Sequence, residues 1–396
     1  MTSASTGVAN GEKYPATRTA TTSTPAGTTA SVLILNAGSS SLKASLLGPG
    51  DTVDGTLELE EWDGSPDHPE LTKFVAAAGP RASVVAHRVV HGGSLFRHAV
   101  LIDDKVIDAI SGLTDLAPLH QPRALASIEA ARRLLPGLPA VACFDTAFHA
   151  GMPDAAARYA LPDGWTTRFG LRRFGFHGLS HAYASRRAAQ LLGRELAKLR
   201  IVSCHLGAGA SLAAVRHGRS VDTTMGFTPL EGLVMATRSG SVDPGLIVWL
   251  LQYGQLEVDE VSAGLEKESG LAGLSGLASG DMRAVLRAAD SGSPAALLAL
   301  EVYLHRLRRE IAAMTAAMNG LDVLVFTGGV GEHSSQVRAA AAKGLEFLGV
   351  ALDPDRNQAT ADAIISTERS AATVLVITAR EDLEMARQAR RVLAAS

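Results

Sequence analysis

The chain has 396 residues, with 46% hydrophobic and 19% charged side chains and a formal net charge of −3 at pH 7. This length exceeds the usual size of a single hydrophobic core, so we expect two domains. The near-neutral charge argues against a nucleic-acid-binding or membrane-surface protein, because such proteins carry a basic face. An anionic substrate must therefore be held by a few well-placed cations.

Residues 1–30 differ in composition from the rest of the chain. They are mostly Ser, Thr, Ala, Gly and Pro and contain almost no large aliphatic side chain. Such a segment cannot bury enough apolar surface to offset its ordering entropy, so we predict a disordered tail. It also lacks the apolar region of a secretory signal.

A regular pattern begins with the apolar run 32–35. A Gly/Ser-rich turn at Asn36–Ser41 follows, and then a second apolar run at Leu42–Leu47. This pattern predicts a β-hairpin whose turn lets a ligand approach the backbone closely, because glycine has no Cβ.

Apolar runs then predict buried strands over 81–90 and 138–144, with an amphipathic helix over 123–135 between them. Cys143 lies in one of these runs and Cys204 in a later one. We predict both as buried, reduced thiols. The sequence contains no run of about eighteen apolar residues, so we expect no membrane span and a cytoplasmic location.

The strand-turn-strand pattern returns farther along the chain. The apolar run 200–204 leads into the glycine-rich turn His205–Ser211, and 212–215 supplies the partner strand. Gly38 and Gly207 therefore occupy equivalent places in two similar halves. This repetition predicts a duplicated α/β unit whose two turns face each other across a cleft.

The final part of the sequence continues the alternation of helices and strands. Helices are predicted over 244–253, 294–318 and 381–393, and buried strands over 322–326 and 374–377.

Glycine-rich turns close three of the predicted strands, at 36–41, 205–211 and 327–332. Such turns expose rows of backbone N–H groups that suit phosphate oxygens. One such turn is commonly only a turn, but three in one chain favour a nucleotide ligand. None has the Walker A spacing, and 328–331 does not match a dinucleotide fingerprint, so a P-loop NTPase or Rossmann dehydrogenase is disfavoured.

Four polar residues are candidates for the chemistry. Arg88 and Arg238 lie beside glycine-rich, apolar backbone, which indicates an anionic ligand or a structural carboxylate partner for each. Asp145 follows a predicted strand at the edge where open α/β sheets place ligands, although it could instead cap a helix. His177 by itself is equally typical of a buried core histidine.

These residues lie in motifs that resemble those of acetate kinases. The similarity is carried, in the family's order, by 32–43, 87–93, 117–120, 144–149, 174–178, 222–232, 237–240, 242–245, 279–283 and 326–332.

The resemblance implies an α/β fold of two duplicated ribonuclease H-like domains with a central cleft, as in sugar kinases, heat-shock 70 ATPases and actin. It implies an N-terminal domain over 31–180 that includes the C-terminal helix 382–396, and a nucleotide-binding domain over 181–381.

The implied activity is reversible, direct in-line transfer of the γ-phosphoryl of ATP to acetate. The resemblance makes Arg88 the carboxylate-binding residue, Asp145 the catalytic acid/base, and His177 and Arg238 stabilisers of the transition state. It implies Mg²⁺ or Mn²⁺ at Asn36 and Glu381. The implied partners are acetate or another short-chain acid, ATP and a second copy of the chain, with no nucleic acid and no membrane.

The resemblance also implies two sets of binding residues. Those expected at the substrate's alkyl end, beside Arg88, are Val90, Leu119, Phe176 and Pro229. Those expected at the nucleotide are Lys43, His205, Leu206, Gly207, Ala208, Gly209, Asp281, Met282, Arg283, Gly329, Val330, Gly331, Glu332 and His333.

Physical chemistry supports these roles in part. Phosphoryl transfer needs alignment and charge cancellation, which two arginines, a protonatable histidine and a metal can supply. A carboxylate nucleophile is already ionised, so we expect Asp145 to orient substrate or help position metal instead of removing a proton.

Several positions depart from the family's motifs. Ala208 stands for Asn, Leu179 for Thr, Gln121 for Asn and His333 for Asn, and 378–382 replaces the usual Pro-Thr-Asn-Glu-Glu. These changes affect the phosphate side more than the acyl pocket. Two alternatives therefore remain open: a kinase for propionate or another short-chain acid, and a non-catalytic ATP-binding scaffold.

Overall fold

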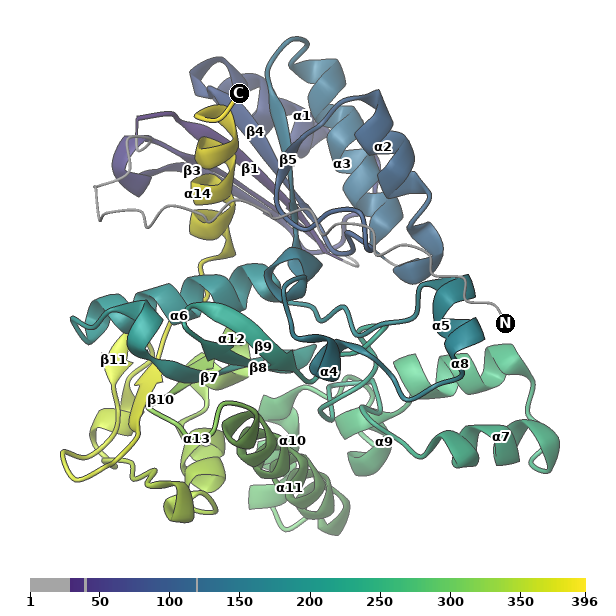
Figure 1. The fold of residues 1–396 in the computed structure, drawn as a ribbon, viewed down its shortest axis with the longest axis vertical. Helices are drawn as coiled ribbons and strands as arrows, with labels where there is room; N and C mark the ends of the chain where they lie inside the picture. The colour runs from purple at the N-terminus through teal and green to yellow at the C-terminus, as the bar shows by residue number, and fades with distance from the viewer. Residues whose placement is uncertain (1–28, 39–40, 119) are drawn as a thin grey trace, which may run out of the picture.

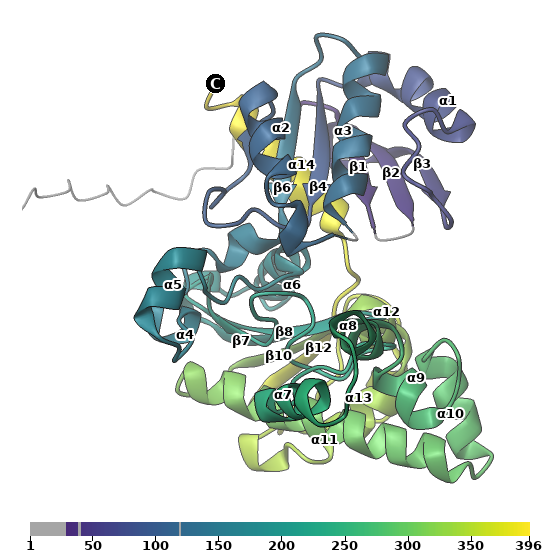
Figure 2. The ribbon, with the colours of Figure 1, turned by 90° about the vertical axis from the view of Figure 1, so that its right-hand side faces the viewer.

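The computed structural model describes residues 29–38, 41–118 and 120–396. Most of the predicted N-terminal tail and the predicted pocket residue Leu119 lie outside these ranges. The described chain forms two lobes, each built around one six-stranded sheet (Figures 1 and 2). Among the described residues, no helix combines the length and apolarity needed to cross a bilayer.

The sheet of the upper lobe in Figure 1 has the strand order β3-β2-β1-β4-β6-β5. Strand β1 pairs antiparallel with β2 and parallel with β4, so the predicted hairpin is confirmed. The bounds are β1 Val32–Ala37, β2 Leu42–Leu47, β3 Val53–Leu59, β4 Val84–Val89, β5 Val100–Leu101 and β6 Ala140–Phe144.

The sheet of the lower lobe repeats this plan in the order β11-β12-β10-β7-β8-β9. Strand β7 is antiparallel to its hairpin partner β8 and parallel to β10, as β1 is to β2 and β4. The duplicated α/β architecture is therefore confirmed. The bounds are β7 Arg200–Leu206, β8 Ala210–Arg216, β9 Arg219–Thr223, β10 Val323–Thr327, β11 Ala363–Ile364 and β12 Thr373–Val376.

Helices cover both faces of each sheet, which explains why the central strands are apolar throughout. The helices are α1 Pro69–Ala78, α2 Asp104–Ser111, α3 Gln121–Leu134, α4 Asp154–Ala157, α5 Asp163–Phe169, α6 Gly178–Leu191, α7 Pro244–Gln252, α8 Val258–Lys267, α9 Gly270–Ser275, α10 Met282–Asp290, α11 Pro294–Ala317, α12 Gly328–His333, α13 Ser335–Ala342 and α14 Glu381–Leu393.

Alternate residues of β1 show how the upper sheet is packed. Leu33 and Leu35 face α1 and α3, whereas Val32 and Ile34 face Met385 and its neighbours on α14. The period of two along a strand sends successive side chains to opposite faces. The chain's last helix thus leaves the lower lobe and packs on the upper sheet (Figure 2).

The lower sheet is covered by α11 on one face and α6 on the other. Leu324 and Phe326 pack with Leu307 of α11, and Val323 packs with Ala188 of α6. Both cysteines are free and buried, as predicted.

Two element predictions were wrong in detail. The segment 327–332 is not an open turn, because α12 begins at Gly328 directly after β10. Gly328 has φ 77°, and a Cβ there would lie 2.8 Å from the carbonyl oxygen of Leu206, so only glycine permits this abrupt junction. The strand predicted from residue 81 starts at Val84, because Gly79–Arg81 form a 3₁₀ turn around a proline.

Candidate active site

The carboxyl ends of three upper-lobe strands meet where the lobes adjoin. Asn36 lies near the end of β1, Arg88 near the end of β4, and Asp145 immediately after β6, where a 3₁₀ helix (Asp145–His149) begins. Glu381 reaches the same place from the first residue of α14. Parallel strands bring their carboxyl ends to one edge, so residues distant in sequence converge there.

One hydrogen-bonded network joins these four residues. Arg88 donates to Asp145 Oδ2 from Nη2 at 2.7 Å and from Nε at 3.1 Å, and to Asn36 Oδ1 at 3.1 Å. Asn36 Nδ2 donates to Glu381 Oε2 at 3.1 Å, and Arg88 Nη1 lies 3.6 Å from that oxygen. The side chain of Asp145 binds Arg88 and caps no helix, so the helix-cap alternative for Asp145 is wrong.

Burial dominates the electrostatics of this network. Asp145 is only 1% exposed, and desolvation raises its pKa to about 6, with Arg88 opposing and Glu381 reinforcing the rise. Burial also disfavours the ionised form of Glu381, but Arg88 and His205 bring its pKa below the usual value. Asp145 Oδ1 is buried and has no hydrogen-bond partner among the described residues.

The lower lobe contributes a cluster of histidines and serines. His177 precedes α6 with φ 55°, and its Nδ1 lies 2.9 Å from Ser211 Oγ. Its ring stacks on His205 with centroids 4.4 Å apart, and His205 Nδ1 lies 2.8 Å from Ser180 Oγ. Burial and the nearby positive charges lower the pKa of His177 well below its usual value, so the imidazole is neutral at pH 7.

The other arginine, Arg238, lies beside His177. A Cβ on Gly209 would be 3.5 Å from His177 Nε2 and 3.7 Å from Arg238 Nη1, so both side chains border the second glycine turn. Arg238 donates to the carbonyl oxygen of Pro229 at 2.9 Å. Within the described ranges no carboxylate forms an ion pair with it, so its charge is available to an anion.

Arg88 and Arg238 act on the same imidazoles. Both charges contribute to the low pKa of His177, and both contribute, after burial, to lowering that of His120 to about 4. The positive charges of both arginines are therefore felt at the same two histidines.

Two of the residues predicted at the alkyl end of the substrate lie in the hydrophobic core. Val90 and Phe176 are 5% and 1% exposed and belong to one apolar cluster with Ala117. Pro229 is half-buried, and its carbonyl oxygen accepts a hydrogen bond from Arg238. Leu119 cannot be placed, because it lies outside the described residues.

A cleft of about 590 Å³ lies on the nucleotide side of the network. Lys43 borders it but is paired with Glu58, with 2.5 Å between Nζ and Oε1. Gly38 and Ser41 of the first glycine turn line it, as does His205 near the end of β7, whereas Gly207 and Gly209 are not among the lining residues. Lining residues include Asn36, Gly38, Ser41, Lys43, Arg88, His205, Gly328, Gly329, Glu332 and Glu381.

Other predicted nucleotide residues have different surroundings. The side chains of Leu206 and Met282 are buried in the lower core, and Val330 packs against it. Asp281 caps α10 and pairs with Arg283, and His333 is exposed at the end of α12. Gly331 accepts a hydrogen bond from Arg338 through its carbonyl oxygen.

The loop that carries Ala208 stays near the predicted Asp281–Arg283 segment. The carbonyl oxygen of Ala208 accepts from the N–H of Ala236 at 3.0 Å, and Gly280 packs against Ala236. Gly207 and Gly209 also bond to one another across this turn at 3.0 Å.

A family model described as the acetokinase family matches residues 70–387. The chain belongs to the acetokinase family. It is 47% identical over 404 residues to an acetate kinase of Synechococcus sp. (strain JA-2-3B'a(2-13)), covering 91% of this chain and 99% of that relative. It is 44% identical over 393 residues to an acetate kinase of Geobacillus kaustophilus (strain HTA426), covering 92% and 99%.

Solved structures of the acetokinase family have the same fold. The chain superposes on an acetate kinase of Porphyromonas gingivalis with a TM-score of 0.84 at 37% identity. It superposes on a propionate kinase of Francisella tularensis with a TM-score of 0.85 at 35% identity. Each superposition covers 92% of this chain and all of the other.

The donor set of this acetokinase-family cleft suits a hard cation. Mg²⁺ is usually bound through one or two carboxylates, with waters and substrate phosphates completing its shell. Such oxygen donors are present in Asp145, Glu381 and the side-chain amide of Asn36. Oδ1 of Asp145 has no hydrogen-bond partner among the described residues and could bind a cation. No group of three His, Cys, Asp or Glu ligands forms a ready-made metal site among residues that the structure describes.

Ser180 and Ser211, which hydrogen-bond to His205 and His177, were not among the predicted site residues, and neither was His120. Ser211 is the last residue of the second glycine turn, and His120 lies in a motif shared with the family. Both positions could therefore have been predicted as site residues from the sequence. Gln121, which stands where the family has Asn, uses its side-chain amide in two hydrogen bonds. It is buried, donates to the carbonyl oxygen of His91 at 3.0 Å and accepts from its N–H at 3.3 Å.

Proposed function

We propose that this chain transfers the γ-phosphoryl of ATP to acetate and forms acetyl phosphate and ADP in a reversible reaction. The observation that supports this most is the network in which Arg88 donates to Asp145 and Asn36. In addition, His177 and Arg238 both border the second glycine turn at Gly209. A short-chain carboxylate fits such a place, with its charge on the arginine and its methyl group against the apolar side chains.

Acetate is ionised at neutral pH and attacks the γ-phosphorus without losing a proton. Arg88, oriented by Asp145, binds and aligns this carboxylate. Arg238 and His177 donate hydrogen bonds to the equatorial phosphoryl oxygens, where each preorganised donor contributes roughly 3–4 kcal/mol to barrier lowering. The neutral His177 therefore acts as a hydrogen-bond donor, which differs from the protonatable role expected from the sequence.

We propose that Mg²⁺ is the metal cofactor and that Asn36, Asp145 and Glu381 hold it. When bound, it neutralises charge on the nucleotide phosphates. Glu332 supports the arrangement indirectly, because its Oε1 accepts from the N–H of Ala379 at 2.9 Å, two residues before Glu381. Gly329 and the backbone of Gly207–Gly209 remain proposed phosphate and nucleotide contacts.

We propose domains at 31–180 with 382–396, and at 181–381. The packing of α14 on the upper sheet supports assigning the C-terminal helix to the first domain. We also propose a cytoplasmic enzyme, supported by two buried free thiols.

We propose a homodimer as the assembly. Helix α7 is almost wholly apolar, yet none of its residues is buried. Trp249 is 53% exposed and Tyr253, just after the helix, 71%. An apolar helix left uncovered indicates a surface that a partner buries.

An assay for acyl phosphate with ATP, Mg²⁺ and acetate, propionate or butyrate tests this function. We expect product with all three acids and the highest kcat/KM with acetate. One methylene in an apolar pocket discriminates by only about 1–3 kcal/mol, so a propionate kinase is the second candidate, favoured by the Francisella tularensis structure. Absence of product with every acid would instead support a non-catalytic scaffold.

A further inference from the structure

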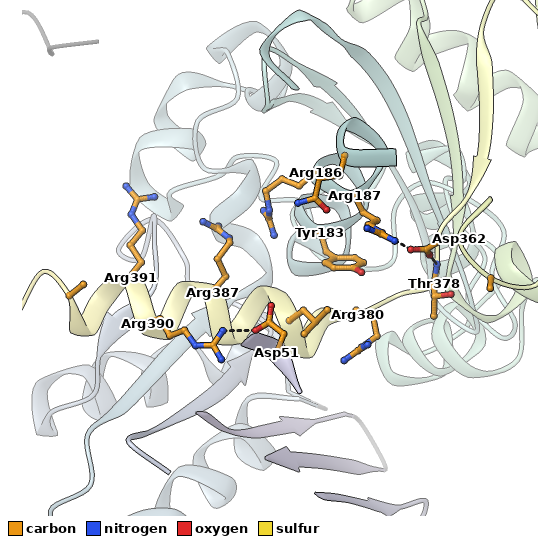
Figure 3. A pocket seen from close by; sticks show the side chains of 14 residues that line it. Asp51, Tyr183, Arg186, Arg187, Asp362, Thr378, Arg380, Arg387, Arg390 and Arg391 are labelled. Carbon is orange, nitrogen blue, oxygen red and sulfur yellow. Dashed lines mark hydrogen bonds and ion pairs between the residues drawn. The ribbon is translucent and has the colours of Figure 1, made fainter. Parts of the chain in front are cut away.

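A second pocket, of about 870 Å³, lies between α6 and α14 and shares no lining residue with the cleft (Figure 3). Its wall is unusually rich in guanidinium groups for a pocket without an assigned ligand. The arginines that line it are Arg186, Arg187, Arg380, Arg387, Arg390 and Arg391.

Three of these arginines each form an ion pair with one aspartate. Arg187 pairs with Asp362 at 2.6 Å and Arg380 with Asp382 at 2.9 Å. Arg390 pairs with Asp51 at 2.5 Å.

Of the other three arginines, two share a single carboxylate and the third has none. Glu384 is fully buried and pairs with both Arg186 and Arg387, while also accepting from Gln388 Nε2 at 2.7 Å. Arg391 forms no ion pair with any residue in the described ranges. Three guanidinium charges therefore face one carboxylate, which leaves an excess of two positive charges.

The geometry concentrates this excess in the pocket. Arg387 and Arg391 are four residues apart and project from one side of α14, with Arg186 opposite them on α6 (Figure 3). Burial, together with the charge of Arg387, lowers the pKa of Arg186 to about 9. Repulsion among these side chains would be relieved by an anion placed between them.

We propose that this pocket binds a phosphorylated small molecule whose phosphoryl oxygens are held by Arg186, Arg387 and Arg391. A phosphoryl dianion balances the excess charge, and guanidinium forks match its oxygens in bidentate geometry. The volume is typical of small-molecule sites, and Tyr183 and Leu383 supply apolar wall for the remainder of the ligand.

The pocket is physically connected to the candidate active site. Along 378–383, Thr378, Arg380 and Leu383 line the pocket, while Ala379, Glu381 and Asp382 line the cleft. Helix α14 packs on the upper sheet and α6 on the lower one, so a ligand between them bridges the two lobes. If catalysis requires lobe closure, which depends on the proposed function, an occupied pocket restrains that motion and lowers kcat.

Calorimetric titration with inorganic pyrophosphate tests the binding site. We expect saturable binding to the full chain, and at least tenfold weaker binding to Arg387→Gln/Arg391→Gln. Arg391→Gln alone, which leaves the Glu384 pairs intact, should weaken binding severalfold. The control Arg216→Gln removes an exposed arginine on β8 and should bind as the wild type does. Absence of saturable binding, or equal affinity in the double variant, overturns the proposal.

Steady-state kinetics at constant free Mg²⁺ test the coupling. Pyrophosphate should lower kcat without changing KM for ATP, and the double variant should lose this inhibition. An equal rise in KM for ATP in both proteins would place pyrophosphate in the cleft and overturn the coupling. If the wild type has no kinase activity but its pyrophosphate binding depends on Arg387 and Arg391, the proposed function fails and the pocket assignment stands.

Discussion

Asp145 has two environments, one for each carboxylate oxygen. Oδ2 accepts two hydrogen bonds from Arg88, which fixes the guanidinium before substrate arrives. Oδ1 is buried and unpartnered among the described residues, so it would be free to hold the proposed Mg²⁺. We therefore propose that Asp145 positions the Arg88 guanidinium and a metal ion, so that no proton transfer is required of it.

Replacing Asp145→Asn should lower kcat by about 10²–10³, because it weakens the orientation of a preorganised donor and removes a metal ligand. Steady-state kinetics with acetate and ATP measure the effect. The matched control is Asp104→Asn on α2, whose side chain is exposed and paired only with Arg132. A kcat close to that of the wild type would remove Asp145 from the mechanism.

The raised pKa of Asp145, about 6, predicts an acidic limb in the pH profile of kcat/KM for acetate. Activity should fall as pH drops through about 6, since the protonated carboxyl no longer pairs with Arg88. The limb belongs to the interacting Asp145–Glu381 pair, so its midpoint is an apparent value. It should vanish in Asp145→Asn, and a limb that persists unchanged would assign it to another group.

The raised pKa of Asp145 also makes a prediction about stability, whose dependence on pH is opposite to that of activity. Asp145 binds its proton more tightly when folded, so its contribution to the free energy of unfolding is complete below about pH 4 and is lost as pH rises through about 6. Comparing chemical denaturation of the wild type and Asp145→Asn from pH 4 to 8 isolates this contribution. A stability difference that stays constant with pH would contradict it.

At the scale of elements, the contact between α6 and the end of β6 joins the two halves of the site. Gly178, the first residue of α6, approaches the backbone of Asp145 so closely that a Cβ would lie 2.0 Å from its carbonyl oxygen. His177 precedes it in the left-handed region, at φ 55°. A strained histidine and an obligatory glycine together hold the imidazole beside the network.

Gly178→Ala should therefore displace α6 from Asp145, lowering kcat and reducing the free energy of unfolding by about 1–3 kcal/mol. Denaturant titration and kinetics measure the two effects. Gly164→Ala in α5 is the control, since a Cβ there meets nothing within 4 Å and should leave both values nearly unchanged. Equal behaviour of the two variants would mean that the close approach is unimportant.

Leu179 has a different environment in the structure from the one that its motif suggested. Leu179 was one of the departures from the family's motifs that we expected to affect the phosphate side. In the structure its side chain is 1% exposed and packs with Met385 and Ala386 of α14. The change from Thr therefore strengthens apolar contact between α6 and α14, the two helices that flank the arginine pocket.

At the scale of the whole molecule, the exposed apolar surface of α7 predicts self-association. Trp249→Glu should shift the protein from dimer to monomer in light scattering coupled to size-exclusion chromatography, because it places a charge in the proposed interface. Phe347→Glu is the control, since Phe347 is equally apolar and 73% exposed but lies outside α7. A wild-type monomer at micromolar concentration would contradict the homodimer.

The sequence by itself determined the two hairpins and the duplicated α/β plan, because apolar periodicity and glycine turns are local signals. Most candidate site residues were named through the resemblance to acetate kinases. Helix α14 was predicted with its observed bounds, Glu381–Leu393, since its pattern is strongly amphipathic. The glycine-rich segment at Gly328 misled the prediction, because whether a strand turns or enters a helix depends on the neighbouring Leu206 carbonyl.

Only the tertiary structure decided which charges meet. Arg88, Asp145 and Glu381 are separated by long stretches of chain, and the carboxyl edge of one sheet brings them together. The packing of distant segments also left Arg391 unpaired among the described residues and buried the side chain of Met282 in the lower core. Burial sets the pKa of Asp145 and the neutrality of His177, and burial is a property of packing between distant segments, which no local pattern specifies.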